Sequence, residues 1–202
     1  MKPFFKQSSI LKKRPYQICK RCVMDTSDPL IEFDSKGICN HCSAFLKKRY
    51  QPKISFDEKS KLDAMFQSIK DSRTKKTIYD VAIGVSGGVD SSYVLYLAQK
   101  AGLKILAIHM DNCWDTATAI LNINNLISLK NVDYRCEVVN WKNFKTTQKI
   151  LIESGLPDIE LPTDSSIPAT LHRICAEYRV KAILSGGNFS NEGILPAAWM
   201  YN

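Results

Sequence analysis

The sequence predicts an α/β protein in which a doubly wound parallel sheet follows a small cysteine-rich module. Strand-like and helix-like runs alternate from residue 79 onward, which is the pattern of a parallel sheet with right-handed crossovers. A glycine turn joins the first strand of this series to an apolar helix. Two Cys-x2-Cys pairs precede the sheet, and 202 residues leave room for one α/β domain with such an appendage.

The charge is unevenly distributed along four predicted segments: a basic arm (1–17), the cysteine module (18–46), a helical connector (47–78) and the α/β domain (79–202). Residues 1–78 contain 18 Lys and Arg against 8 Asp and Glu, whereas residues 79–202 contain 10 against 12. The basic excess suits a nucleic-acid-binding arm, a solvated surface, or a face for an anionic substrate or acidic partner. No apolar run reaches membrane-spanning length, so we expect a cytoplasmic protein with no membrane partner.

The cysteine module has the spacing of a structural zinc site. Cys19 and Cys22 form the first pair, and sixteen residues separate them from Cys39 and Cys42. Each pair places two thiolates on one side of a tight turn, and four thiolates complete a tetrahedral zinc site with no open position. Disulfides or unrelated free thiols are the alternatives, although disulfides are uncommon without a secretory signal. His41 either replaces one thiolate or is a bystander, and residues 30–38 suggest a β-hairpin between the pairs.

The first strand of the α/β domain ends in a loop suited to an anion. Residues 79–85 alternate β-branched and small residues, which indicates a buried strand, and an apolar helix with Gly102 as its stop follows the loop. Strand, glycine turn and helix together aim backbone N–H groups and a helix N-terminus at one point. The expected anion ligands are Ser86, Gly87, Gly88, Ser91 and Ser92. Asp90 is out of place there unless a cation such as Mg²⁺ shares the site. The alternative is a glycine turn kept for steric reasons.

The rest of the chain continues the alternation of strands and helices. We expect strands over residues 104–112, 133–139 and 181–184, and helices over 116–130, 141–154 and about 166–178. The carboxyl ends of parallel strands meet at one edge of a sheet, near the point where the strand order reverses. The polar residues expected at that edge are His109, Asp111, Ser185, Gly186, Asn188 and Glu192. His109 to Asp111 should border an adenosine, although a histidine beside a sheet is often simply packed. Asp164 either faces the site or caps a helix.

The loop from Ser86 to Ser91 resembles the pyrophosphate loop of the ATP pyrophosphatases, which release pyrophosphate from ATP while adenylating a carbonyl oxygen. It is not a Walker A loop, because no Gly-Lys-Ser/Thr follows the glycines. The resemblance implies an adenine nucleotide alpha-hydrolase-like sheet. The loop residues that it implies are Ser86, Gly87, Gly88, Asp90 and Ser91. Together with the polar strand ends, the full set of expected ATP-binding residues is Ser86, Gly87, Gly88, Asp90, Ser91, Ser92, His109, Asp111, Ser185, Gly186 and Asn188.

A longer series of motifs resembles the N-acetyl sugar amidotransferases of bacterial surface-polysaccharide and flagellin-glycan biosynthesis. The series comprises Cys19-x2-Cys-Val-Met-Asp-Thr-Ser-Asp-Pro29, Cys39-Asn-His-Cys42, Ser86-Gly-Gly-Val-Asp-Ser91, His109-Met-Asp-Asn112, Pro162-Thr-Asp164, Leu184-Ser-Gly-Gly-Asn188 and Glu192-Gly-Ile-Leu-Pro196. Such an enzyme converts the acetamido group of a nucleotide-linked sugar into an acetamidino group, using ATP and ammonia. The resemblance implies glutaminase and cyclase-like partner subunits, because no cysteine of this chain sits in a convincing glutaminase setting.

The implied chemistry assigns roles to two carboxylates. The amide oxygen attacks the α-phosphorus, pyrophosphate leaves from the glycine loop, and ammonia displaces AMP. Asp90 is expected to position Mg²⁺, and Glu192 is a weaker candidate for metal, sugar or proton transfer. The chain departs from the family in having Cys113 after Asn112. Family members also continue well past the fourth strand, so a fifth strand and much of the sugar site are expected beyond residue 202.

Two other readings stay open. In a tRNA-thiolating ATP pyrophosphatase the basic segment would hold RNA phosphates, and Cys113 or Cys175 would carry sulfur. No Cys-x2-Cys pair follows the loop within the α/β domain, which makes a nucleic-acid substrate the less expected one. In a nucleotide-binding remnant, ATP would bind without any AMP being formed.

Overall fold

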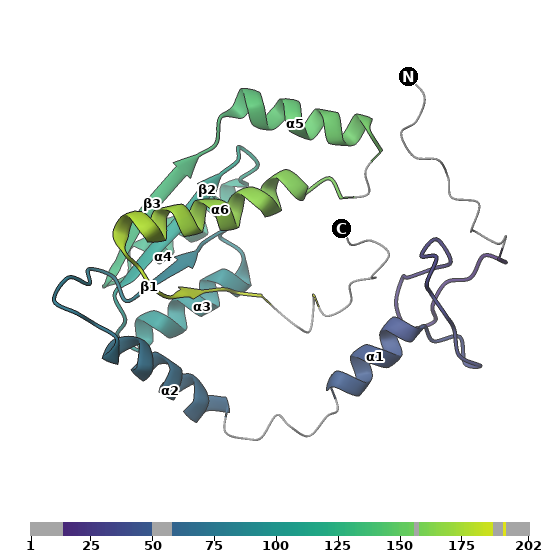
Figure 1. The fold of residues 1–202 in the computed structure, drawn as a ribbon, viewed down its shortest axis with the longest axis horizontal. Coiled ribbons are helices and arrows are strands. Elements are labelled where there is room, and N and C mark those ends of the chain that lie inside the picture. The colour runs from purple at the N-terminus through teal and green to yellow at the C-terminus, as the bar shows by residue number, and fades with distance from the viewer. Residues whose placement is uncertain (1–13, 50–57, 156–157, 188–191, 193–202) are drawn as a thin grey trace. The chain divides into compact units, whose positions relative to one another are not determined.

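The computed structural model describes residues 14–49, 58–155, 158–187 and 192 (Figure 1). The chain divides into two compact units, residues 1–55 with 188–202 and residues 56–187. Residues 1–13 of the expected arm and 50–57 of the expected connector lie outside the described residues. We find no helix among the described residues whose length and apolar character would suit a membrane span.

The first unit is built around its four cysteines rather than around regular secondary structure. Cys19, Cys39 and Cys42 are buried with Ile31, and α1 (Asn40–Arg49) begins inside the second cysteine pair. The hairpin expected over residues 30–38 is reduced to a single antiparallel bridge between Phe33 and Cys39. A carboxylate stabilises the turn between these two residues, because Asp34 Oδ1 accepts a hydrogen bond from the backbone N–H of Ile38 at 2.8 Å.

The second unit is a four-stranded parallel sheet with the order β3-β2-β1-β4, so the α/β prediction is confirmed. Its elements are α2 (Glu58–Asp71), β1 (Val81–Gly84), α3 (Val89–Lys100), β2 (Ile105–Asp111), α4 (Ala117–Ile127), β3 (Val132–Val138), α5 (Trp141–Glu153), α6 (Leu161–Tyr178) and β4 (Ile183–Leu184). The chain runs outward from β1 to β3 and then returns to place β4 on the other side of β1. The strand order therefore reverses between β1 and β4.

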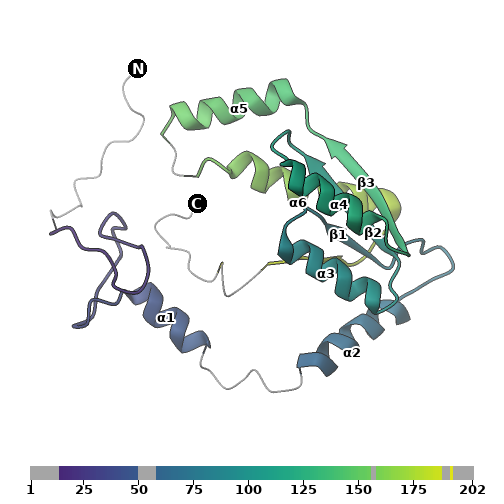
Figure 2. The same ribbon diagram turned by 180° about the vertical axis from the view of Figure 1, so that it is seen from behind.

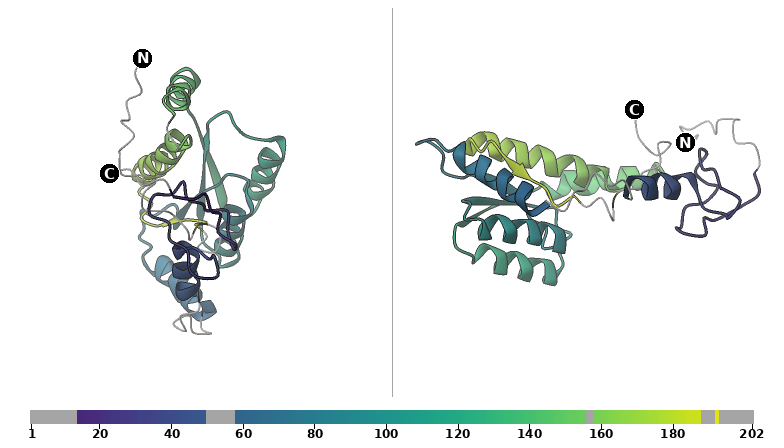
Figure 3. Two further views of the ribbon diagram at one scale, coloured as in Figure 1. Left: turned by 90° about the vertical axis from the view of Figure 1, so that its right-hand side faces the viewer. Right: turned by 90° about the horizontal axis from the view of Figure 1, so that it is seen from below.

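Helices cover both faces of the sheet, as a doubly wound fold requires. On one face Phe66 of α2 and Leu95 of α3 pack on Ile83 and Ile105, with Leu126 of α4 at the margin. On the other face α6 packs on Ala82, Leu106 and Ile108 through Ile174 and Cys175. The buried residues of this unit therefore form two clusters, one on each face of the sheet. Figure 1 shows α6 in front of the sheet, and Figure 2, which views the molecule from behind, shows α3 and α4 in front of the sheet. Figure 3 shows the same layers from two further sides.

Two local devices fix the ends of the core elements. Gly102 has a φ of +77° and donates to Gln99, so it ends α3 as the sequence predicts. Asp80, whose side chain is buried just before β1, accepts hydrogen bonds from the Arg73 guanidinium and from the backbone N–H of Lys104 at 2.7 Å. Asp80 thereby joins the segment before β1 to the segment before β2.

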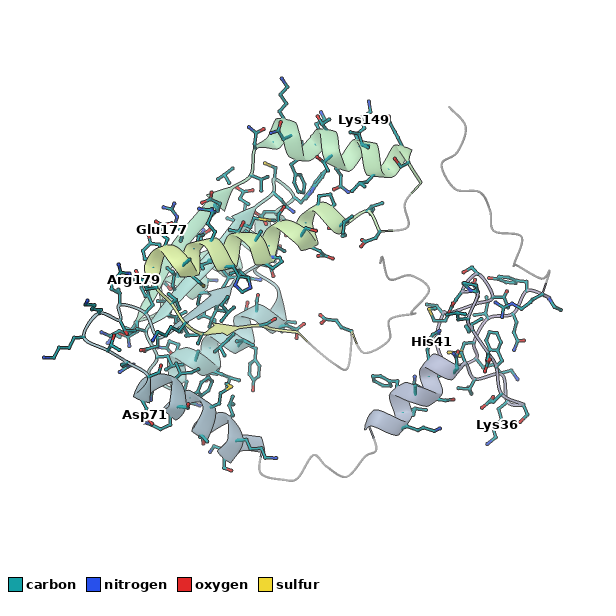
Figure 4. The ribbon with its side chains drawn as sticks, viewed as in Figure 1. Lys36, His41, Asp71, Lys149, Glu177 and Arg179 are labelled. Carbon is teal, nitrogen blue, oxygen red and sulfur yellow. The ribbon has the colours of Figure 1, made fainter. Side chains whose placement is uncertain are left out.

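One helix boundary differs from the prediction. The last helix, α6, begins at Leu161 rather than near residue 166, with Pro162 in its first turn and Pro168 inside it. A proline costs little in the first turn, where its missing N–H has no intrahelical partner. The helix ends at Arg179, which has a φ of 57° (labelled in Figure 4). The early start brings the N-terminal turn of α6 toward the carboxyl edge of the sheet.

Candidate functional site

The glycine loop after β1 is held in a conformation that only glycine adopts without strain. Gly87 has a φ of +72°, and a Cβ built on it would lie 2.4 Å from the carbonyl oxygen of Ala119 on α4. Its own carbonyl accepts a hydrogen bond from Asn122 Nδ2 at 2.9 Å. The loop is therefore pressed against α4 and cannot carry a side chain at this position. Ala119 and Asn122, which sequence reasoning missed, set this close approach.

The N-terminus of α3 is open to a ligand. Gly88 is the N-cap residue and has no side chain to accept from the first-turn N–H groups. By contrast, Thr116 caps α4 and Asn140 caps α5 through their side chains. The first-turn N–H groups and the helix dipole of α3 are thus available to an anion, and a phosphate group suits them.

The serines of the loop divide into two groups. Ser92 donates from its hydroxyl to the Gly88 carbonyl at 2.7 Å, which braces the first turn of α3. Ser86 and Ser91 lie 3.3 Å apart through their hydroxyl oxygens, a long contact that yields readily to a better acceptor. Ser91 also donates to the Gly88 carbonyl, but at a longer 3.3 Å. Ser86 and Ser91 therefore have only long contacts and remain the predicted hydroxyl donors to a phosphate, whereas Ser92 has a short structural one.

The loop after β4 closes against the glycine loop. A Cβ on Gly186 would lie 3.0 Å from the backbone carbon of Asp90 and 3.0 Å from the backbone nitrogen of Ser91. The two glycine-containing loops, after β1 and after β4, therefore meet at the point where the strand order reverses. Asp90 is half-buried at this junction, and its expected role toward Mg²⁺ stays a prediction.

The end of β2 contributes a buried histidine to this edge. His109 Nδ1 lies 2.8 Å from the carbonyl oxygen of Val85, and its Nε2 lies 2.9 Å from Asp115 Oδ2. A carbonyl only accepts, so Nδ1 carries a proton, and a second proton must lie between Nε2 and the carboxylate. His109 thus fixes the last residue before the glycine loop. Its expected place beside an adenosine stays a prediction.

The remaining expected residues occupy different positions. Asp111 accepts from the Cys113 N–H at 2.8 Å, and Asn112 Nδ2 lies 3.4 Å from Thr163 Oγ1, which links β2 to α6. Ser185 is exposed after β4. Asn188 lies outside the described residues, and Glu192 is exposed in the first unit, so its role also stays a prediction.

In the first unit the four predicted cysteines come together. Their sulfur atoms all lie within 4.8 Å of one another, with 3.9 Å between Cys19 and Cys42 and 3.7 Å between Cys22 and Cys39. Tetrahedral zinc with Zn–S bonds of about 2.3 Å separates its sulfurs by about 3.8 Å. The four cysteines therefore fit a zinc ion. They would hold it as four thiolates in a closed structural site.

Backbone N–H groups already point at the sulfurs. The N–H groups of Arg21 and Cys39 donate to Cys19 Sγ at 3.4 and 3.3 Å. Burial alone would raise the pKa of Cys19, but N–H donors from Arg21, Cys22 and Cys39 bring it down to about 6. Burial, the largest influence on Cys22, raises its pKa to about 12. A bound cation would favour the thiolate form of all four cysteines.

His41 is not one of the four ligands. It lies in the first turn of α1 (labelled in Figure 4), and its Nε2 lies 2.6 Å from Asp28 Oδ2, whose side chain is fully buried. Asp28 Oδ1 also accepts from the Leu30 N–H at 2.9 Å, and the Asp28 carbonyl accepts from Arg14 at 2.7 Å. The Asp-Thr-Ser-Asp-Pro stretch between the cysteine pairs therefore has a structural function, because Asp28 ties the second pair to the segment between the pairs.

Comparison with known proteins adds a partial match. Residues 79–148 match the family described as tRNA methyl transferase HUP domain. Mitochondrial tRNA-specific 2-thiouridylase 1 of Drosophila melanogaster is 37% identical over 59 residues, which covers 29% of this chain and only 15% of that protein.

Two solved structures are also similar to the chain. NH3-dependent NAD synthetase from Campylobacter jejuni has a TM-score of 0.49 and 16% identity, over 65% of this chain and 56% of that one. NMN synthetase from Francisella tularensis has a TM-score of 0.43 and 19% identity, over 63% and 54%. The family match spans the glycine loop at the strand-order reversal, so this part of the α/β unit is similar to the PP-loop ATP pyrophosphatases.

Proposed function

We propose that the α/β unit binds ATP where β1 and β4 diverge and transfers its adenylyl group to a carbonyl oxygen of a second substrate. The observation that carries this proposal is the open N-terminus of α3, with Gly87 and Gly88 at its start and Gly186 against it. This arrangement presents backbone N–H groups to the leaving pyrophosphate. The PP-loop matches through residues 79–148 support the same use of ATP.

The proposed reaction has two steps. The carbonyl oxygen of the second substrate bonds to the α-phosphorus, and the bond from that phosphorus to the bridging oxygen breaks to release pyrophosphate. A nitrogen or sulfur nucleophile then attacks the activated carbon, and AMP leaves with the original carbonyl oxygen. Mg²⁺, when bound, would neutralise charge on the phosphates, and Asp90 is the residue we propose to position it.

The acceptor we propose is the acetamido group of a nucleotide-linked sugar, with ammonia as nucleophile and an acetamidino group as product. The support is the motif order that runs from Cys19 to Asn188, together with the lack of a Cys-x2-Cys pair in residues 56–202. Glutaminase and cyclase-like partners would supply the ammonia. ATP as substrate and cysteines without disulfides suit a cytoplasmic location.

Thiolation of tRNA is the second candidate, and the comparisons favour it over the sugar reaction. Both the matching family and the Drosophila relative are named for tRNA. Cys113 is the best-placed sulfur carrier because it is exposed at the carboxyl end of β2. Cys175 is buried in the core beneath α6, and burial raises the pKa of its thiol. A thiol that is both buried and protonated is a poor nucleophile.

Mass spectrometry of parallel reactions separates the candidates. Each reaction contains Mg-ATP and the full chain, with ammonium and a panel of nucleotide-linked acetamido sugars in one set and bulk tRNA with a persulfide sulfur donor in the other. AMP with a sugar whose carbonyl oxygen has become NH supports the first acceptor. AMP only with tRNA, lost in Cys113→Ser, supports the second. ATP binding without AMP in either set contradicts the proposed adenylation.

A further inference from the structure

Two tryptophans form an exposed pair beside the proposed ATP site. Trp114 and Trp141 pack edge to face, with ring centroids 5.6 Å apart and planes at 81°. Their exposed fractions are 56% and 40%, which is high for the largest apolar side chain. Trp114 comes three residues after the end of β2, and Trp141 is the first residue of α5, three residues after the end of β3. Both therefore stand at the carboxyl edge of the sheet.

The backbone on each side of the pair is held in place. Asp111 accepts from the Cys113 N–H at 2.8 Å, and Asn112 accepts from the Trp114 N–H at 3.2 Å. Cys113 itself adopts a φ of 66°, which is uncommon for a residue other than glycine. Asn140 caps α5 by accepting from the Asn143 N–H at 3.1 Å. The main chain that bears the two indoles is thus held in place, which lowers the cost of ordering it around a ligand.

The surroundings of the pair are those of a site for a polar planar ligand. Lys145 Nζ lies 5.9 Å from the centroid of the Trp141 ring and adds a positive charge. An open groove of about 320 Å³ begins at the same first turn of α5 and continues to the N-terminal part of α6. The residues that line this groove carry no charge; they are Val139, Asn140, Asn143, Phe144, Thr147, Pro162, Ser165 and Ser166. Apolar atoms make up most of this lining, and its amide and hydroxyl groups can pair with neutral polar groups of a ligand.

We propose that Trp114, Trp141 and Lys145 bind the nucleotide portion of the second substrate, by stacking its base on an indole and pairing its phosphate with the lysine. Indole faces bind any base, because every base presents a π-face. The uncharged groove would receive the group that lies beyond the phosphate. This inference rests on the proposed function, since it assigns the acceptor to the β2 and β3 side of the edge and the phosphates of ATP to the β1 and β4 side. A nucleotide is the chemistry that a sugar donor and RNA share, and the two probes below distinguish these sources.

Calorimetry on the full chain tests the inference with two probes, uridine diphosphate N-acetylglucosamine and a short single-stranded RNA, and with a non-hydrolysable ATP analogue as reference. Trp141→Ala and Trp114→Ala should each lower the affinity for the probe about ten-fold or more, whereas Trp141→Phe should retain most of the affinity. Lys145→Gln should weaken binding and flatten its salt dependence. Tyr96→Ala, an exposed aromatic on α3, is the matched control and should change nothing.

The outcomes separate this inference from the proposed function. Unchanged probe affinity in both alanine variants, or no binding of either probe to the native chain, overturns the inference. Equal loss of affinity for the ATP analogue overturns it too, because the indoles would then belong to the ATP site. If the analogue fails to bind while a probe binds through the tryptophans, the proposed function fails and the inference stands. Circular dichroism of each variant shows that the fold is retained.

Discussion

The Cα of Gly87 faces the backbone of Ala119 so closely that a Cβ on the glycine would lie 2.4 Å from the carbonyl oxygen. Because φ is also +72°, Gly87→Ala combines a clash with backbone strain. We expect the rate of ATP-dependent pyrophosphate release to fall at least about a hundred-fold in this variant. We also expect it to lower the free energy of unfolding by about 1–3 kcal/mol.

Gly88→Ala is the matched control for that substitution. A Cβ on Gly88 would meet only the Ser86 hydroxyl at 3.3 Å, and the backbone has a φ of −77°. Its stability loss should therefore be smaller than that of Gly87→Ala in denaturant unfolding. Equal stability of the native protein and Gly87→Ala would show that α4 does not restrain the loop.

Asp80 gives the α/β unit a defined dependence of stability on pH. Burial raises the pKa of this carboxyl, but the Arg73 guanidinium and the Lys104 N–H outweigh burial and lower it. A lowered folded pKa adds stability above the unfolded value of about 3.9, and that stability is lost as pH falls through the folded pKa. Urea unfolding at pH 7 and pH 3 should show this loss in the native protein.

Asp80→Asn should remove most of that pH dependence and cost about 1–3 kcal/mol at pH 7, because the buried carboxylate has two charge-assisted donors. Asp71→Asn is the control, since Asp71 is an exposed carboxylate that accepts from Gln67. A pH profile for Asp80→Asn that matches the native profile between pH 3 and pH 7 would contradict this assignment.

His109 is expected to support the glycine loop through the Val85 carbonyl, in addition to its predicted place beside an adenosine. His109→Phe leaves that carbonyl without its donor, so both the unfolding free energy and the rate of pyrophosphate release should fall. Asp115→Asn should be tolerated within about 1 kcal/mol, because an amide can still pair with Nε2. Nitrogen-15 NMR of the imidazole should find a proton on Nδ1. An unprotonated Nδ1 would contradict the contact.

The cysteine cluster should bind one zinc ion per chain. Cys39→Ser and Cys42→Ser should lose the metal and destabilise the first unit, because a structural zinc contributes directly to folding. His41→Ala should keep the metal, since its Nε2 contacts Asp28 rather than completing the sulfur cluster. Elemental analysis measures each case, with Cys136→Ser as control. Loss of zinc from His41→Ala alone would assign His41 a ligand role.

Sequence periodicity was enough to predict the parallel sheet, because β-branched runs separated by amphipathic helices allow few other folds. It misplaced the start of α6, because Pro162 and the acidic residues around it indicated a loop. The glycine loop could be located from its own residues. Gly186 was expected at the same edge of the sheet, but the contact of Gly87 with Ala119 was not, because Ala119 is distant in sequence and belongs to no recognisable motif.

In the first unit, too, some features could be predicted from the sequence and others could not. The four cysteines were predictable because zinc ligation depends on side-chain chemistry and local spacing. The role of Asp28 was not, because its contact with His41 spans thirteen residues and depends on burial of the carboxylate. The predicted hairpin was largely replaced by turns, because the bridge between Phe33 and Cys39 already closes that segment.

The central claim is adenylation of a carbonyl oxygen at the β1 and β4 edge, and oxygen-18 transfer tests it most directly. The acetamido carbonyl of the nucleotide-linked sugar, and separately the base carbonyls of tRNA, would be labelled before reaction with Mg-ATP. The account predicts AMP that carries the label from the true acceptor, in the native protein but not in Gly87→Ala. Unlabelled AMP, or ADP in place of AMP, would contradict it.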